Sequence, residues 1–174
     1  MNYFEFYEIP VSFNVDASKL KRTFYQNSKK YHPDFYTLES DEKQAEILEL
    51  STLNNEAYQT LNDFDKRMKY VLELKGVLGE EGQNSIPQDF LMEMMEINEG
   101  LMELEFDYDD ATFQSTKKSV EQLDNQIFSE VKEIIDNYDD ATATEEDLKK
   151  IKLFFQKKRY LLRIFKNLSK FATA

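Results

Sequence analysis

The chain has 174 residues and a net charge of −12, from 34 acidic and 22 basic side chains. Hydrophobic residues make up 41% of it, which is enough apolar surface for a packed core and excludes a wholly disordered protein. The absence of cysteine excludes disulfides, thiol nucleophiles and sulfur-ligated metal centres, and the single histidine, His32, excludes a multi-histidine metal site. We therefore expect no resident cofactor or metal, and no nucleic acid or anionic membrane as a partner of so acidic a molecule.

Few residues interrupt helices, because the chain has only four glycines and three prolines. An all-α fold with long helices is therefore expected. No apolar run approaches the roughly 18 residues of a membrane span, and the N-terminus lacks a signal-peptide pattern, so we expect a cytoplasmic protein. A short aromatic-rich helix is predicted within residues 3–9, where it can cover the helices that follow.

A basic amphipathic helix is predicted from the N-cap residue Asp16 to about Tyr31. Pro33 ends it, because the proline ring disfavours helical geometry at the preceding residue. Residues 16–31 carry five basic and one acidic side chain, so this segment has a net charge of +4 inside an acidic protein.

The next helix is predicted over residues 40–61, with Ser40 as its cap, and a shorter one over residues 63–75. Because a short polar loop joins two long helices with opposed apolar faces, those two are expected to form an antiparallel hairpin. Three of the four glycines and one proline fall within residues 76–87, which we interpret as a linker. The first domain is therefore predicted at residues 1–75.

A second domain is predicted at residues 88–174, as an antiparallel three-helix bundle with helices at about 88–106, 112–138 and 145–171. Residues 144–147 resemble a capping box at the start of the last helix. The core stripe of the middle helix is expected at Val120, Leu123, Ile127, Val131 and Ile134.

The outer segments of this bundle carry opposite charge. Residues 80–110 hold eleven acidic side chains and no basic one, whereas residues 148–174 hold nine basic side chains and no acidic one. Side-by-side packing of these segments would offset the two fields, although an exposed ion pair contributes only ~0 to 1 kcal/mol.

The first bundle helix has two apolar stripes about 100° apart. The core stripe holds Phe90, Met94, Ile97, Leu101 and Leu104, and the second holds Leu91, Met95 and Met102. One helix cannot bury both stripes in a simple bundle, so the second is expected to meet the first domain, another helix or a partner. Methionines adapt to varied surfaces, and the neighbouring glutamates favour a basic partner. Gly100 is unusual in mid-helix and costs ~1 kcal/mol relative to alanine.

The loop between the hairpin helices contains the tripeptide His32-Pro33-Asp34. By itself this is ordinary loop chemistry, but a basic helix precedes it and residues 55–61 after it follow the pattern Asn-x-Ala-Tyr-x-x-Leu. In this combination residues 1–75 resemble the J-domain family, the co-chaperones that dock on DnaK-type heat-shock ATPases. The resemblance implies that the tripeptide stimulates ATP hydrolysis in that partner. It also implies a docking surface made of Lys19, Arg22, Tyr25, Lys29 and Lys30.

This interpretation is physically sensible. A proline-bounded loop presents an imidazole and a carboxylate at little ordering cost, and a cationic helix steers toward an acidic groove. Many members of the family carry lysine directly after the tripeptide, whereas this chain has Phe35.

A J-domain followed by a short linker and an acidic-faced three-helix bundle is similar to the HscB family of iron–sulfur cluster assembly co-chaperones, over essentially the whole chain. Residues 90–93, Phe-Leu-Met-Glu, match that family's segment near the start of the first bundle helix. The resemblance implies that this helix face, with one position on the last helix, binds the cluster scaffold IscU. The implied residues are Leu91, Met92, Met95, Glu96, Glu99, Glu103 and Leu153.

We therefore expect a monomeric adaptor, with no chemistry of its own, that stimulates an HscA or DnaK-type ATPase and delivers an IscU-like scaffold to it. The main alternative is a J-domain protein of another class, whose bundle binds a different client or self-associates through the methionine-rich stripe. A helical interaction protein with a coincidental tripeptide is a further alternative. An enzyme using His32 with Asp34 is the weakest hypothesis, because no second base, thiol or metal-binding cluster accompanies the histidine.

Overall fold

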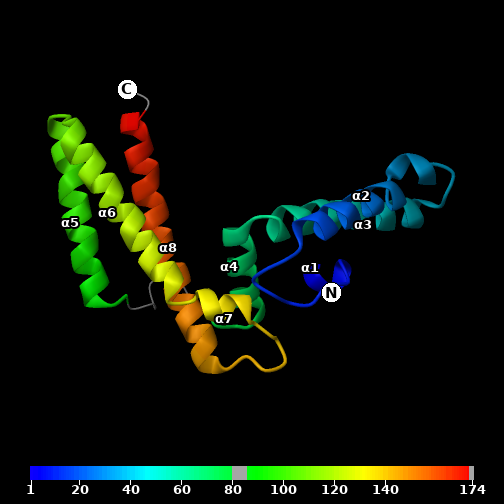
Figure 1. Ribbon diagram of the computed structural model, residues 1–174. Helices are drawn as coiled ribbons and strands as arrows, with labels where there is room; N and C mark the ends of the chain where they lie inside the picture. Colours follow the sequence, from blue (N-terminus) through cyan, green and yellow to red (C-terminus); the bar gives the residue numbers. More distant parts are fainter. Residues whose placement is uncertain (80–85, 173–174) are drawn as a thin grey trace. The chain divides into compact units, whose positions relative to one another are not determined.

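The computed structural model describes residues 1–79 and 86–172, and the regular elements within these ranges are all helices (Figure 1). The all-α class expected from the sequence is confirmed. The chain forms two compact units. The first comprises Met1–Lys75 and Tyr138–Ala143, and the second comprises Gly76–Asn137 and Thr144–Ala174. Within the predicted linker, residues 80–85 lie outside the described residues.

The first unit contains five helices in its described residues: α1 (Tyr3–Phe6), α2 (Ala17–Lys30), the short 3-10 helix η1 (Pro33–Tyr36), α3 (Asp41–Leu61) and α4 (Phe64–Leu74). A polar side chain caps the start of each α-helix by accepting a hydrogen bond from a backbone N–H of the first turn. The four caps are Asn2, Asp16, Ser40 and Asp63. The predicted helix starts at Asp16 and Ser40 are therefore confirmed.

Helices α2 and α3 pack against each other as a hairpin, as predicted (Figure 1). The buried side chain of Asn54 on α3 joins the neighbouring elements. Its Oδ1 accepts a hydrogen bond from the Tyr7 hydroxyl at 2.8 Å, and its Nδ2 lies 3.1 Å from the Phe24 carbonyl and 3.2 Å from Ser28 Oγ on α2. Every polar atom of this amide is thus satisfied inside the core, which fixes the register of α2 on α3.

The segment Tyr138–Ala143 belongs to the first unit, although it is far away in sequence. The ring of Tyr138 packs edge-on against the fully buried Phe13, with ring centroids 4.7 Å apart, and Asp140 forms an ion pair with Lys75. The Arg67 guanidinium donates a hydrogen bond to the Phe13 carbonyl at 2.7 Å from the other side. These contacts hold the segment Tyr138–Ala143 on the first unit.

The second unit contains α5 (Gln88–Phe106), α6 (Asp110–Ser129), the short α7 (Lys132–Asp136) and α8 (Glu145–Ala172). Helices α5, α6 and α8 pack on one another around an apolar core (Figure 1). The core stripe predicted for α5 is buried. The capping box at α8 is also present, because the Asp147 N–H donates to Thr144 Oγ1 at 3.1 Å and the Thr144 N–H donates to the Asp147 carboxylate at 3.5 Å.

The prediction of a single helix over residues 112–138 is wrong, because the structure divides this segment into α6 and α7. At the break the Val131 N–H bonds the Phe128 carbonyl, three residues back, at 3.1 Å instead of continuing the α-helical ladder. The helical period of α6 therefore does not carry through to α7. Ile135 is buried where Ile134 was predicted, and Ile134 is only half-buried.

Helices α5 and α8 pack on each other, as considered from the sequence, and two ion pairs of α8 go to the third helix, α6. Across the bundle, Lys158 of α8 pairs with Asp124 of α6, and Lys157 pairs at 3.8 Å with Glu130, the C-cap of α6. Two basic side chains of α8 thus form ion pairs with α6. The acidic side chains along α5 are exposed.

Candidate functional site

The His-Pro-Asp tripeptide lies at the tip of the hairpin, between α2 and α3, and its three side chains are exposed. His32 is the N-cap of η1, where its Nδ1 accepts a hydrogen bond from the Asp34 backbone N–H at 3.3 Å. The Asp34 carboxylate lies 3.8 Å from the same nitrogen. Pro33 occupies the first turn of η1, where a missing N–H leaves no helical hydrogen bond unmade.

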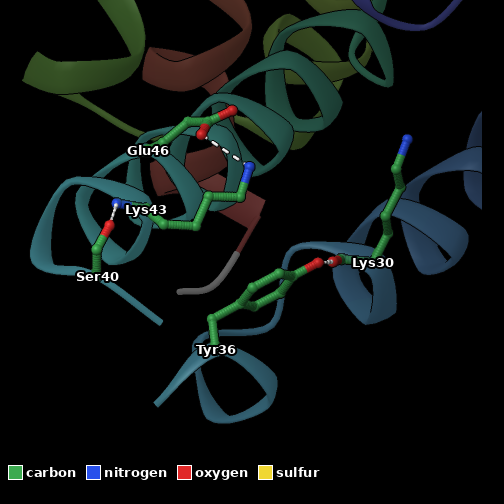
Figure 2. A network of polar contacts seen from close by, with 5 residues as sticks. All are labelled: Lys30, Tyr36, Ser40, Lys43 and Glu46. Carbon is green, nitrogen blue, oxygen red and sulfur yellow. Dashed lines mark hydrogen bonds and ion pairs between the residues drawn. The ribbon is translucent and has the colours of Figure 1, made fainter. Parts of the chain in front are cut away.

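Hydrogen bonds on both flanks hold this tip in place. The Tyr36 hydroxyl donates to the backbone carbonyl of Lys30 at 2.6 Å, which joins η1 to the last residue of α2 (Figure 2). On the other flank, Ser40 Oγ accepts from the Lys43 N–H at 3.3 Å and begins α3 (Figure 2). The loop is therefore ordered before any partner binds, which lowers the entropic cost of binding.

The hydrogen bond to His32 determines what the imidazole presents to a partner. Because Nδ1 accepts from a backbone donor, the neutral ring carries its proton on Nε2. The tip thus presents an N–H donor and, from Asp34, a carboxylate acceptor. No serine, threonine or lysine side chain is hydrogen-bonded to this imidazole in the described part of the chain.

The predicted docking residues lie on α2 next to this tip, and all of them are exposed. No ion pair within residues 1–79 and 86–172 involves a basic side chain of α2, so these charges are not neutralised by the protein itself. The Lys30 ammonium lies over the Tyr31 ring, 5.1 Å from its centroid, beside the tripeptide. The tip and the cationic face are thereby parts of one continuous surface, made of Lys19, Arg22, Tyr25, Lys29, Lys30, His32, Pro33 and Asp34.

The predicted client residues of α5 also lie at the surface. Leu91, Met92, Met95 and Met102 are between 40% and 69% exposed, which is unusual for apolar side chains along one helix. Leu153 is half-buried on α8, a helix that packs against α5. The second apolar stripe of α5 is thus free of the bundle core. This stripe and the neighbouring Met92 together form what we call the α5 apolar face, made of Leu91, Met92, Met95 and Met102.

A groove of about 480 Å³ runs between α5 and α6, beside the α5 apolar face. Gly100 forms part of its floor, because a Cβ at this position would lie 2.6 Å from Thr116 Oγ1 on α6. This close approach explains the glycine in mid-helix. The three glutamates predicted for the client site line one wall, and hydroxyl side chains of α6 line the other. The lining includes Glu96, Glu99, Glu103, Thr112, Ser115, Thr116 and Ser119.

Sequence reasoning missed the hydroxyl wall of this groove. Its four residues on α6 follow the spacing i, i+3, i+4, i+7, so the pattern was visible as a polar helix face. What the sequence did not show is that this face lies opposite the α5 glutamates. No ion pair of the described residues engages Glu96, Glu99 or Glu103, which leaves the groove strongly anionic.

The described ranges contain no group of three or more His, Asp or Glu side chains arranged to hold a metal ion. Within the same ranges, each helix is too short or too polar to cross a bilayer.

Two known family models match the chain, one for each part of this site. The DnaJ domain matches residues 2–70, which include the hairpin and its tip, and the HSCB C-terminal oligomerisation domain matches residues 86–169, which include α5 and the groove. The chain belongs to the HscB family of J-domain co-chaperones. The resemblance inferred from the tripeptide and the bundle is therefore confirmed.

Individual HscB proteins support this assignment. The chain is 37% identical over 102 residues to a co-chaperone protein HscB homolog of Vibrio cholerae, which covers 58% of this chain and 60% of that protein. It is 30% identical over 164 residues to the human iron–sulfur cluster co-chaperone protein HscB, covering 94% of this chain and 65% of the human protein. A homolog from Psychromonas ingrahamii is 28% identical over 157 residues, or 90% and 92% of the two chains.

Solved HscB structures have the same fold. The crystal structure of the human co-chaperone matches with a TM-score of 0.77 at 28% identity, covering 97% of this chain and 81% of that one. HscB from Vibrio cholerae matches with a TM-score of 0.74 at 22% identity, covering 99% and 98% of the two chains.

Proposed function

We propose that this HscB-family protein is an adaptor in iron–sulfur cluster assembly. Its first unit stimulates the ATPase of an HscA or DnaK-type chaperone, and its second unit brings an IscU-like scaffold protein to that chaperone. The observation that carries the proposal is the exposed, hydrogen-bonded tip of His32, Pro33 and Asp34 beside a cationic helix face that forms no ion pair with the acidic groups of residues 1–79 and 86–172.

The tip acts by binding and performs no catalytic step. The unpaired charges of α2 steer the hairpin toward an acidic groove on the chaperone, where the His32 Nε2–H and the Asp34 carboxylate each meet a polar partner. Acceleration follows if these contacts are stronger in the chaperone conformation that hydrolyses ATP than in its resting conformation. The preformed loop makes the contacts without first paying for its own ordering.

The second unit offers a surface that suits a client segment with both apolar and basic side chains. The α5 apolar face supplies adaptable methionines, and the adjoining groove supplies three unpaired carboxylates and a row of hydroxyls. A scaffold segment with an apolar residue next to a lysine or arginine fits both parts at once. The glutamates also discriminate against acidic segments, because like charges in a groove repel.

A second candidate keeps the J-domain function and replaces the client with another copy of the chain. It is favoured by the exposed α5 apolar face and by the name of the matching C-terminal family, which refers to oligomerisation. Light scattering separates the two, because the monomer that we expect has a mass of 20.7 kDa at all concentrations. A dimer that disappears on replacement of Met92 and Met95 by Ser would favour the second candidate.

The replacement of His32 by Gln tests the function of the tip. The variant is predicted to leave the chaperone at its basal rate of ATP hydrolysis, whereas the wild-type chain accelerates single-turnover hydrolysis. Its unfolding midpoint should not change, because the imidazole is exposed. The matched control is Thr37→Ala, in the same loop, which should stimulate like wild type. Stimulation retained by the His32→Gln variant would contradict the proposed function.

A further inference from the structure

A second apolar surface lies directly after the tripeptide. Phe35 is 74% exposed, Leu38 is fully exposed, and Leu48 on α3 is 59% exposed. Three large apolar side chains at the tip of an otherwise polar hairpin expose area that folding does not use.

A pocket of about 250 Å³ accompanies these side chains, between η1 and α3. Its volume suits one or two branched apolar side chains of a partner. Pro33 of the tripeptide forms one wall, so the pocket and the His-Pro-Asp tip share a residue. The lining residues are Pro33, Tyr36, Gln44, Ala45, Ile47 and Leu48.

The backbone that carries this surface is held from both helices. The Tyr36 hydroxyl bonds the Lys30 carbonyl on α2, as Figure 2 shows. On the other side Gln44 Nε2 donates to the Glu39 carbonyl at 2.9 Å and to that of Thr37 at 3.5 Å. Leu38 lies between these two carbonyls in sequence. An apolar side chain that is both fully exposed and carried by a fixed backbone is suited to binding, because its burial costs little further ordering.

We propose that Phe35, Leu38, Leu48 and the adjoining pocket form an apolar extension of the chaperone-docking surface, which receives an apolar segment of the chaperone next to its acidic groove. This inference rests on the proposed function. The apolar surface adjoins the His-Pro-Asp tip. The Phe35 ring lies 5.6 Å from the His32 ring, and Pro33 lines the pocket, so a partner that touches the tripeptide from this side meets the apolar surface as well.

The extension changes how binding responds to salt. Contacts of α2 are electrostatic and weaken as ionic strength rises, whereas apolar burial does not. A chaperone complex of this chain is therefore expected to keep much of its affinity in salt concentrations that suppress the contribution of α2.

The test compares variants of the full chain for binding to the ATP-bound chaperone at about 0.05 M and 0.5 M salt. Phe35→Ser combined with Leu38→Ser is expected to lower the affinity on the order of tenfold at both salt concentrations. Ala45→Phe, which fills the pocket and leaves the tip intact, is expected to lower it as well. Leu74→Ser is the matched control, because Leu74 is an exposed leucine on α4 of the same unit.

Three results would overturn the inference. If both variants bind like wild type while His32→Gln still abolishes stimulation, the apolar surface does not take part in docking and the proposed function stands. If the double variant instead dissociates a dimer of the chain, the occupant is a second copy. Stimulation by His32→Gln would remove the proposed function, and this inference with it.

Discussion

Asn54 is the residue on which the geometry of the hairpin depends. Its amide lies in the core and connects Tyr7, Phe24 and Ser28, three residues from two other parts of the first unit. Burial of a polar group is tolerated only when its hydrogen bonds are made, and this amide makes three of them to neighbouring elements. The register of α2 on α3 therefore depends on one buried side chain.

Replacement of Asn54 by Ala is predicted to lower the free energy of unfolding by about 2 kcal/mol, because it removes the hydrogen bonds of the buried amide to Tyr7, Phe24 and Ser28. Urea unfolding followed by circular dichroism measures this change. The control is Asn55→Ala, because Asn55 is exposed on the same helix and is expected to change stability by less than about 0.5 kcal/mol. Equal effects of the two variants would show that the amide network does not stabilise the hairpin.

Gly100 sets the distance between α5 and α6. An alanine in mid-helix normally gains about 1 kcal/mol over glycine. Here the added Cβ would lie 2.6 Å from Thr116 Oγ1, and the buried Thr116 has little room to move. Gly100→Ala is therefore predicted to destabilise the second unit by about 1 kcal/mol in urea unfolding.

A second substitution, at Thr116, is predicted to restore the stability that Gly100→Ala removes. Thr116→Ala removes the atoms that the new Cβ would meet, so the double variant should be more stable than the sum of the two single changes. Additive effects would mean that the two helices do not touch at this point in solution.

At the scale of the helix, α2 presents a positively charged surface along its length. Its basic side chains are exposed and form no ion pair with any described residue, and the residues between its N-cap and C-cap include no acidic side chain. Such a helix speeds encounter with an acidic surface, and the effect is screened beyond about 8 Å at physiological salt.

Arg22→Glu combined with Lys29→Glu is predicted to slow association with the chaperone by about tenfold or more at low salt, with a much smaller effect at 0.5 M salt. Stopped-flow mixing measures the association rate at both salt concentrations. Lys66→Glu with Lys69→Glu on α4 changes the net charge equally, and should slow association less. An equal effect of the two pairs would show that net charge, and not the face of α2, steers the encounter.

Most of the helices could be predicted because their ends are marked by residues with a local physical effect. Asp16, Ser40 and Asp63 cap helix starts, and Pro33 ends the first long helix, each by chemistry that acts within a few residues. The break after Ser129 carries no such mark, since neither glycine nor proline is present and Val131 continues the apolar period. The turn there is set by tertiary packing, which sequence periodicity does not contain.

The candidate site divides in the same way. The exposure of His32 and of the stripe from Leu91 to Met102 was predictable, because a loop tip and a surplus apolar stripe both have to face outward. The groove between α5 and α6 and the apolar surface at Phe35 could not be predicted from the sequence. Both depend on which side chains two elements bring together, such as Glu99 with Ser115, or Pro33 with Leu48.

At the scale of the whole molecule, the two proposed partner surfaces lie on different compact units of one chain and have opposite charge. The first presents unpaired bases, and the second presents unpaired acids within a chain whose net charge is −12. Opposite charge keeps each partner on its own surface, because a partner that fits one is repelled by the other. Joining the two surfaces covalently raises the effective concentration of client at the chaperone.

The central claim, that one chain has to hold both partners, is tested most directly by mixing two full-length variants. His32→Gln removes the function of the tip and keeps the α5 apolar face. Replacement of Leu91, Met92 and Met95 by Ala removes that face and keeps the tip. The replaced side chains are all exposed, so both variants are expected to fold. The measurement is the ATPase rate of the chaperone with the scaffold protein present.

With wild type, the scaffold is predicted to raise the rate above that produced by the co-chaperone alone. An equimolar mixture of the two variants is predicted to give no such increase, because no single chain connects client and chaperone. A mixture that restores the wild-type rate would contradict the account, since it would show that the two surfaces act independently.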